Sequence, residues 1–238
     1  MAINQNLLQR PSDRSLFLVA GIGFPLIVLL GFFKSYIFRL FFENPPIPNL
    51  LVHLHGVSMM LWVLYFTMQV VLIRSKNVKL HITMGIIGIA LTIFVLVIGL
   101  ATTYDSQIVR NTAPPGLEPH KFFLIPLFDM VLFALFFGGA IYYRKSPAEH
   151  KSLMLLTVFN FLGSPVSRIP LGFENFMYQA FGFPALLAVI ALGWHTWKHQ
   201  KLNKVFAFGT LIFLVSLPLR VFIGETETWL KIFRWLAP

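Results

Sequence analysis

The sequence predicts an all-α, polytopic membrane protein in which about seven helices cross the bilayer as one bundle. Of its 238 residues, 57% are hydrophobic and only 12% are charged, whereas a soluble domain carries about a quarter charged residues. The apolar residues come in runs of about 20, the length that a helix needs to cross a hydrocarbon core of roughly 30 Å. In water, such a chain would expose far more apolar surface than soluble monomers tolerate.

Seven apolar runs follow one another, and turn or breaker residues separate them. We expect membrane spans at 15–42, 51–74, 80–104, 122–144, 150–169, 173–197 and 203–224. The fifth run is the weakest of these, because polar and breaker residues interrupt it at Asn160, Ser164, Pro165, Ser167 and Arg168. The stretch 226–238 is short, aromatic and basic, which is typical of a helix in the membrane interface with Trp229 and Trp235 at headgroup level. A single transmembrane domain therefore covers 1–238.

The formal charge of +10 is explained by the lipid bilayer as partner and not by nucleic acid, since basic residues collect in cytoplasmic loops beside anionic lipid. The N-terminus and the loops near 75, 147 and 200 share one side of the bundle. Against Asp13 and Glu149, that side carries Arg10, Arg14, Arg74, Lys76, Lys79, Arg144, Lys145, Lys151, Lys198, Lys201 and Lys204. The opposite side balances eight basic residues with six acids. The N-terminus is therefore expected in the cytoplasm.

Several kinds of site are excluded by residues that the sequence lacks. Cysteine is absent, so the chain has no disulfide, no Cys metal site and no Cys nucleophile. No Gly-rich phosphate loop, GxSxG elbow or HExxH motif is present. The polar N-terminal segment does not have the order of a cleaved signal peptide, and the first span is expected to be retained.

Five histidines lie at the N-terminal ends of consecutive predicted spans, namely His53, His55, His81, His120 and His150. Because consecutive spans are antiparallel, these ends alternate between the two membrane faces. His53, His55 and His120 are expected together at the outer face, and His81 and His150 at the inner face. Two imidazoles on neighbouring helices are the axial ligands that a six-coordinate b-type haem needs. For any single one of them, the alternative is an ordinary polar contact at the interface.

A second interpretation uses the inner face, where His195 and His199 lie four residues apart on one helix face and could bind one metal ion. Together with His81 and His150 they would hold non-haem iron or another transition metal, as in a membrane oxygenase or hydroxylase. A third interpretation is a cofactor-free accessory subunit of a membrane complex or a small-solute carrier. In that case the histidines only make polar contacts.

Ionisable residues inside membrane spans are costly and usually mark function or a paired network. Asp129 lies about two turns into the fourth span, and Arg168 and Arg220 approach the same outer level from the fifth and seventh spans. One interpretation is an outer pocket for an anionic group, such as haem propionates, a quinone headgroup or an acidic substrate. The alternative is a structural tether between Asp129 and either Arg168 or Arg220.

Two stretches carry a family resemblance, GFFKSYIFRLFFENPPIPNLLVHLHGVSMMLWVLYFTMQVVLIRSKNVKLHITMGIIGIAL and YYRKSPAEHKSLMLLTVFNFLGSPVSRIPL. Their pattern is HLHG, a Trp and a Gln along the helix, a basic loop leading into His and Gly, and a later HKxLMLL. It resembles a family of uncharacterised bacterial multi-helix membrane proteins, which implies a multi-pass protein of the bacterial inner membrane but no activity.

A looser similarity is to the dihaem b-type transmembrane reductases, whose core helices carry paired histidine ligands. By position, the resemblance makes His55, His81, His120 and His150 the matching ligands, with His53 competing with His55. Arg168 and Arg220 would then meet the cofactor from the outer side. We therefore expect a haem-containing redox protein that carries electrons in the membrane and exchanges them with quinone or a larger membrane complex.

Overall fold

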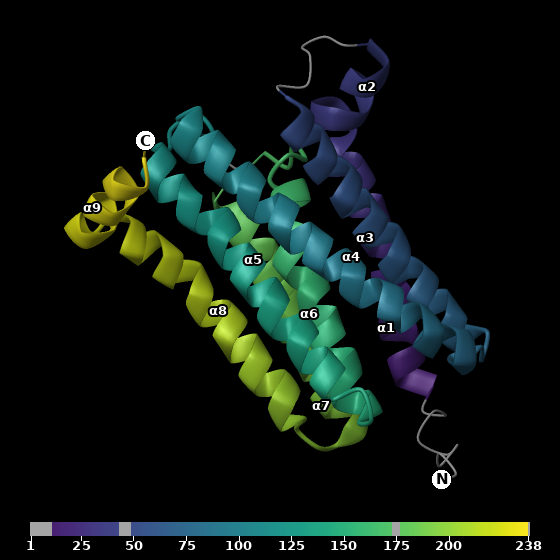
Figure 1. The fold of residues 1–238 in the computed structure, drawn as a ribbon. Coiled ribbons are helices and arrows are strands. Elements are labelled where there is room, and N and C mark those ends of the chain that lie inside the picture. Colours follow the sequence, from purple (N-terminus) through teal and green to yellow (C-terminus); the bar gives the residue numbers. More distant parts are fainter. Residues whose placement is uncertain (1–10, 43–48, 173–176, 238) are drawn as a thin grey trace.

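The computed structural model describes residues 11–42, 49–172 and 177–237, and within these ranges the ordered elements are helices, with no strand (Figure 1). The α-helices are α1 (Pro11–Phe32), α2 (Phe38–Phe42), α3 (Leu50–Arg74), α4 (Val78–Tyr104), α5 (Pro119–Tyr142), α6 (Pro147–Val166), α7 (Phe183–His199), α8 (Lys204–Gly224) and α9 (Glu227–Leu236). Three π-helical segments extend or precede them, namely η2 (Phe33–Ile37), η3 (Asp105–Val109) and η4 (Tyr178–Gly182). Predicted segments at 1–10 and 173–176, and Pro238, lie outside the described residues.

The all-α membrane fold is confirmed. Six helical stretches of the described residues are long and apolar enough to cross a membrane, at Leu16–Ile37, Leu50–Arg74, Val78–Val109, Pro119–Tyr142, Tyr178–His199 and Lys204–Gly224. They coincide with six of the seven predicted runs. The remaining run, 150–169, corresponds to α6, which is the one that polar residues interrupt.

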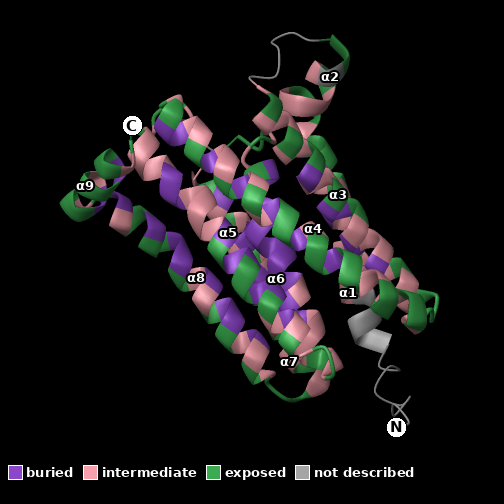
Figure 2. Cartoon of the chain, viewed as in Figure 1, coloured by how far each residue is buried: buried purple, intermediate pink, exposed green. Residues whose placement is uncertain are grey.

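Helix α6 lies in the middle of the bundle, where it packs against α1, α5, α7 and α8 (Figure 2). Most of its residues from Ser152 onward are buried, and the polar residues Thr157 and Asn160 are among them. With 20 residues and a rise of about 1.5 Å per residue, it is about 30 Å long and matches the hydrocarbon core. Because four helices separate it from lipid, α6 can be less apolar than its neighbours.

Local sequence sets where several helices begin. At the start of α3, α4 and α8, an Asn side chain accepts a hydrogen bond from the backbone N–H three residues later. The nitrogen-to-oxygen distances are 2.9, 3.2 and 3.0 Å. Thr226 does the same for α9 at 3.2 Å. Pro119, Pro147 and Pro184 stand in the first turns of α5, α6 and α7. These caps satisfy otherwise unpaired N–H groups, and proline has none to lose there.

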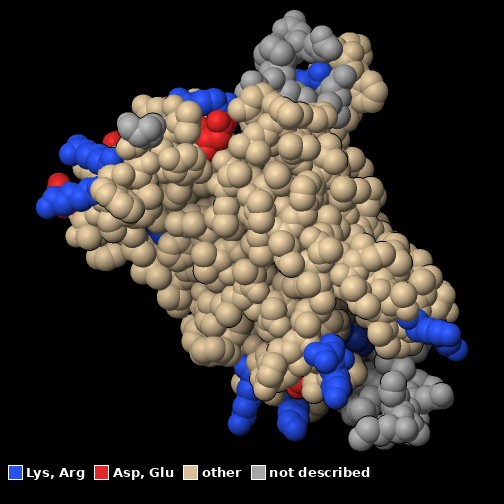
Figure 3. Space-filling model, in the orientation of Figure 1, with Lys and Arg blue, Asp and Glu red and all other residues tan. Residues whose placement is uncertain are grey.

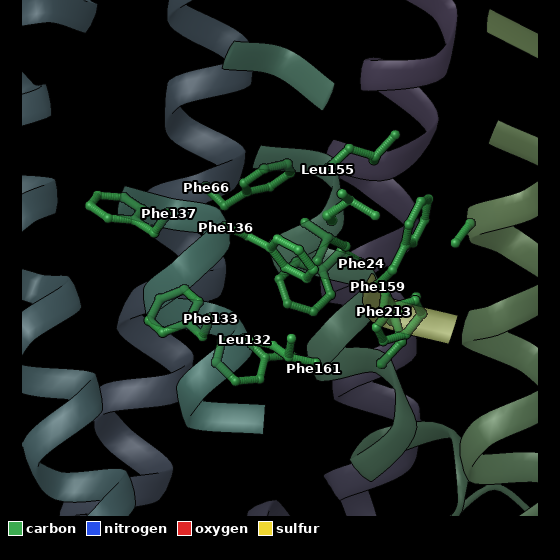
Figure 4. Packing of buried hydrophobic residues seen from close by; sticks show 14 of the residues in the cluster. Phe24, Phe66, Leu132, Phe133, Phe136, Phe137, Leu155, Phe159, Phe161 and Phe213 are labelled. Atoms are coloured by element: carbon green, nitrogen blue, oxygen red, sulfur yellow. The ribbon is translucent and has the colours of Figure 1, made fainter. Parts of the chain in front are cut away.

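The interior of the bundle is aromatic (Figure 4). Trp62 of α3 meets Phe133 and Phe137 of α5 with ring centroids 4.8 and 5.6 Å apart. Phe133 in turn meets Phe161 of α6 at 4.6 Å. Trp62 and Phe66, which follow His55 along α3, are therefore packing residues of this core.

On the face shown in Figure 3, charged side chains gather at the two ends of the molecule, and a broad region between them is almost free of charge. The helix α1 begins at one end of the bundle and α8 finishes at the other, which fits an odd number of crossings (Figure 1).

The tail helix α9 folds against α5, where Trp229 is buried beside Phe123 with ring centroids 5.8 Å apart. Trp235, by contrast, is 82% exposed.

The close approach of α1 to α6 generates a stability prediction. A Cβ added to Gly31 would lie 2.7 Å from the Cα of Pro165 and closer still to its carbonyl group. We expect Gly31→Ala to force the helices apart, cost at least about 1–3 kcal/mol and lower the thermal midpoint in detergent on the order of 5 °C. Gly23→Ala on the same helix is the control, since a Cβ there meets nothing within 4 Å. Equal midpoints for both variants would contradict the packing.

Candidate functional site

A buried ion pair joins α5 to α8. Nη1 of Arg220 donates to Oδ1 of Asp129 at 2.7 Å. Arg220 is only 2% exposed, whereas the Asp129 side chain keeps 20% of its surface accessible. Of the two tethers that the sequence left open, the structure therefore contains the one to Arg220.

The other donors of Arg220 also have partners. Nη1 donates to the Ile125 carbonyl at 3.2 Å, Nε donates to the Ser216 carbonyl at 3.2 Å, and Nη2 donates to Ser216 Oγ at 3.2 Å. The rings of Phe128 and Phe181 each lie 5.4 Å from the guanidinium carbon. A guanidinium has five N–H donors, so one N–H on Nη2 remains without a partner among the described residues.

A cavity of about 420 Å³ opens beside this ion pair, between α5, α6, α8 and the segment that η4 begins. Its polar lining consists of Asp129, Asn160, Ser164, Ser167, Arg168 and Arg220. Most of the remaining lining is apolar, and Phe159, Phe181 and Phe213 belong to it. A volume of this size, with apolar walls and a few convergent polar groups, is typical of small-molecule sites. The π-helical η4 supplies Ala180 and Phe181 to the wall, and such turns are frequent at functional sites.

Asn160 is the polar group of the cavity that sequence reasoning missed, because it was read only as an interruption of an apolar run. It is 4% exposed, and its Nδ2 donates to the backbone carbonyl of Asp129 at 2.8 Å. A carbonyl can only accept, so this bond fixes which end of the amide carries the oxygen. Oδ1 is buried and has no hydrogen-bond partner among the described residues.

Arg168 lies two residues beyond the end of α6, also in the wall of the cavity. Its Nη1 donates to the carbonyl of Ser164 at 2.5 Å and to Ser164 Oγ at 2.9 Å. Its guanidinium carbon lies 4.7 Å from the centre of the Phe32 ring. Among the described residues, no carboxylate pairs with it. The cavity thus carries one neutralised charge pair and one further cation.

At the opposite end of the bundle, the imidazoles of His81 and His150 lie side by side in an edge-on arrangement. Their ring centroids are 6.3 Å apart, and the ring planes are 83° apart. His150 Nδ1 lies 2.8 Å from the carbonyl oxygen of Ala140. His81 Nδ1 is buried without a hydrogen-bond partner among the described residues. The expected neighbourhood of these two residues is therefore present.

The outer histidines lie in separate surroundings. His53 Nδ1 is 3.0 Å from the hydroxyl of Tyr36. His120 lies 3.5 Å from Glu118 and packs its ring on Phe233 of α9. The backbone carbonyl of His120 accepts a bond of 2.6 Å from Trp229 Nε1. The predicted outer grouping of His120 with His53 and His55 is not formed as ring contacts between them in the described structure.

His55 and the remaining histidine pair complete the set. His55 Nδ1 is buried and has no hydrogen-bond partner among the described residues, and Arg168 is within electrostatic reach of its ring. His195 and His199 stack on each other with ring centroids 4.3 Å apart. In the part of the chain that the structure describes, no three His, Asp or Glu side chains converge closely enough to hold one metal ion.

Comparisons with protein-family profiles, with characterised proteins and with solved structures return no significant match. The resemblances found in the sequence therefore stay predictions, and a function has to be argued from the geometry of the cavity and of the histidines.

The ion pair predicts a strong coupling between two positions. Removing one partner leaves a buried charge alone, so Asp129→Leu and Arg220→Met should each cost about 3–5 kcal/mol. The double variant should be more stable than the sum of the two costs implies, because neither charge is then left behind. Unfolding in mixed detergent micelles, followed by helical circular dichroism, measures all four proteins. Strictly additive costs would show that the two side chains do not interact.

Proposed function

We propose that this protein is a membrane redox protein that binds haem b between His81 and His150 and carries electrons within the bilayer. The observation that supports it most is the placement of these two imidazoles, which come from different helices and whose ring centroids lie 6.3 Å apart. The haem iron would supply one-electron chemistry by cycling between two oxidation states. The macrocycle supplies four ligands, so two protein ligands are sufficient.

The spacing of the rings suits a shared metal. If each imidazole nitrogen lies about 2 Å from the iron, as imidazole nitrogens do in zinc sites, the two ring centroids are about 6 Å apart. The value of 6.3 Å for His81 and His150 agrees with this expectation. Both residues stand one turn inside the N-terminus of a helix, His81 in α4 and His150 in α6.

The hydrogen bond of His150 prepares its other nitrogen for a metal. The carbonyl of Ala140 can only accept, so His150 Nδ1 carries the proton in the 2.8 Å contact. The lone pair is then on Nε2, and the bond holds the ring in one orientation. Metal-binding histidines usually make such a bond with the nitrogen that does not bind the metal. His81 Nδ1 is buried and has no such partner among the described residues.

The surface next to the pair suits a flat amphipathic group. A Cβ added to Gly85, one turn beyond His81, meets nothing within 4 Å, so space remains on that side of α4. Gly88, in contrast, packs against the Tyr65 side chain and serves helix packing. Exposed Lys79 and Arg144 lie near His81 and His150 in the sequence and would attract the propionates of a haem.

We further infer that the protein is placed in a bacterial inner membrane with the basic end, and so the N-terminus, in the cytoplasm. Exposed basic residues at the connections after α3 and α5 support this, namely Arg74, Lys76, Arg144 and Lys145. They carry the charge asymmetry on which the positive-inside rule depends. The haem pair would then lie near the cytoplasmic face.

The visible spectrum tests the haem proposal. Protein produced with ample haem should show a Soret band that shifts on reduction with dithionite, and His81→Ala or His150→Ala should each lose the spectrum of this haem. His199→Ala is the matched control at the same end of the bundle and should keep the spectrum. The absence of a Soret band in the parent protein would overturn the proposal. Iron or another transition metal without haem, lost in His199→Ala, would favour the non-haem alternative.

The orientation is tested by single-cysteine labelling, which is clean because the chain has no cysteine. Lys145→Cys and Thr228→Cys place exposed thiols at opposite ends of the bundle. In intact cells whose outer membrane has been permeabilised, a membrane-impermeant maleimide should label Thr228→Cys and spare Lys145→Cys. Inverted vesicles should give the reverse pattern. Labelling of Lys145→Cys in cells would invert the assigned orientation.

A further inference from the structure

We propose that the cavity beside Asp129 and Arg220 binds the reduced head of a lipid-soluble quinone, a hydroquinone, in preference to the oxidised form. The binding itself does not require the haem. The further role of the site as an electron source for the histidine pair rests on the proposed function.

The deep end of the cavity demands a ligand that donates hydrogen bonds. Asn160 Oδ1 is buried without a partner among the described residues, and leaving a buried acceptor unpaired costs free energy. Asp129 Oδ1 accepts a hydrogen bond from Arg220, and Asp129 Oδ2 has no protein donor in the described ranges. Asp129, whose side chain is partly accessible, is the acceptor that a ligand meets first. Asn160 Oδ1 is buried, so a donor reaches it only when neighbouring side chains shift. Against these acceptors stands the single spare N–H on Arg220 Nη2.

The excess of acceptors over donors should make the cavity bind the hydroquinone more tightly than the quinone. A hydroquinone hydroxyl can donate to Asp129 or Asn160 and still accept from Arg220. A quinone carbonyl can only accept, so it would leave both acceptors unpaired and lie against their lone pairs. A site with buried groups that need a hydrogen-bond donor binds an analogue without that donor far more weakly, because its polar groups then stay unpaired.

The far end of the cavity suits the second oxygen of the ring. Ser164 lies one helical turn beyond Asn160 along α6, a rise of about 6 Å. This is comparable to the separation of the two oxygens across a hydroquinone ring. The guanidinium of Arg168 is held at that level by its bonds to Ser164, where its remaining N–H groups can donate to the second oxygen.

The walls fit a flat aromatic ring with an apolar tail. Phe159, Phe181 and Phe213 line the cavity, and aromatic side chains stack on planar rings. The volume of about 420 Å³ accommodates a substituted ring with the first part of an isoprenoid chain. A fatty acid is a poorer fit, because its carboxylate would meet the acceptors of Asp129 and Asn160.

The test compares a hydroquinone bearing one isoprene unit with the matching benzoquinone, by anaerobic calorimetric titration into the purified protein. The hydroquinone is titrated into reduced protein and the quinone into oxidised protein, so that no electron moves in either experiment. We expect the hydroquinone to bind at least tenfold more tightly. Equal affinity, a preference for the quinone, or no binding of either would overturn the proposal.

Two cavity variants test whether Asp129 and Asn160 cause the preference for the hydroquinone. Asn160→Leu should weaken hydroquinone binding at least tenfold and leave quinone binding little changed. Asp129→Asn keeps an oxygen for Arg220 and turns an N–H₂ toward the cavity, so the preference should narrow or reverse. Thr210→Val is the control, since Thr210 is a buried polar residue of α8 outside the cavity lining. Unchanged preference in both cavity variants would contradict the assignment.

Two further measurements distinguish misfolding from lost binding, and a failure of the haem proposal from a failure of the cavity proposal. Helical circular dichroism and a single elution peak verify folding, and if Asn160→Leu does not fold, Asp129→Asn decides the question. His81→Ala should lose the haem spectrum and keep hydroquinone binding. Hydroquinone binding in a protein without a Soret band would overturn the proposed function alone, and a Soret band without hydroquinone binding would overturn the cavity assignment alone.

Discussion

The enclosure of α6 by α1, α5, α7 and α8 is the constraint on which both candidate sites depend. A polar residue that faces lipid is costly, and the cost disappears when neighbouring helices take the place of lipid. This shielding lets one helix carry His150 at its start, Asn160 in its middle and Ser164 near its end. The same enclosure needs close helix contact, which Gly31 of α1 permits at Pro165. The packing that hides α6 therefore also positions the polar groups.

The Asp129–Arg220 pair illustrates how a costly feature can specify geometry. A buried ion pair is weak support for stability, because desolvation of both charges offsets much of their attraction. Here the guanidinium is oriented by Ile125, Ser216 and two aromatic rings. Its fixed position commits one carboxylate oxygen of Asp129 and leaves the other toward the cavity. The pair thus defines the chemical character of the site, with acceptors deep in the cavity and a cation, Arg168, at the far end.

The distance between the histidine pair and the cavity along the bundle follows from the number of helical residues between them. His150 and Asn160 are ten residues apart on α6, and His150 is bonded to Ala140, eleven residues beyond Asp129 on α5. Both helices give a rise of about 15 Å between the levels of the sites. The buried rings of Phe133, Phe136 and Phe161 belong to the core of these two helices (Figure 4). A largely apolar interior therefore separates the histidine pair near the basic end from the polar cavity.

The sequence by itself determined the membrane class, the order of the helices and the level of each histidine and charge, because apolar length and helical rise depend only on the chain. It also placed His81 beside His150, since both begin helices that enter from the same end. Only the tertiary structure decided that Asp129 pairs with Arg220 and not Arg168, and that His120 turns to α9. The physical reason is rotation: spacing along a helix gives the depth of a residue, whereas the direction that it faces is set by side-chain packing between helices. The cavity and the unpaired oxygen of Asn160 arise from that packing, and no pattern within one helix could have predicted them.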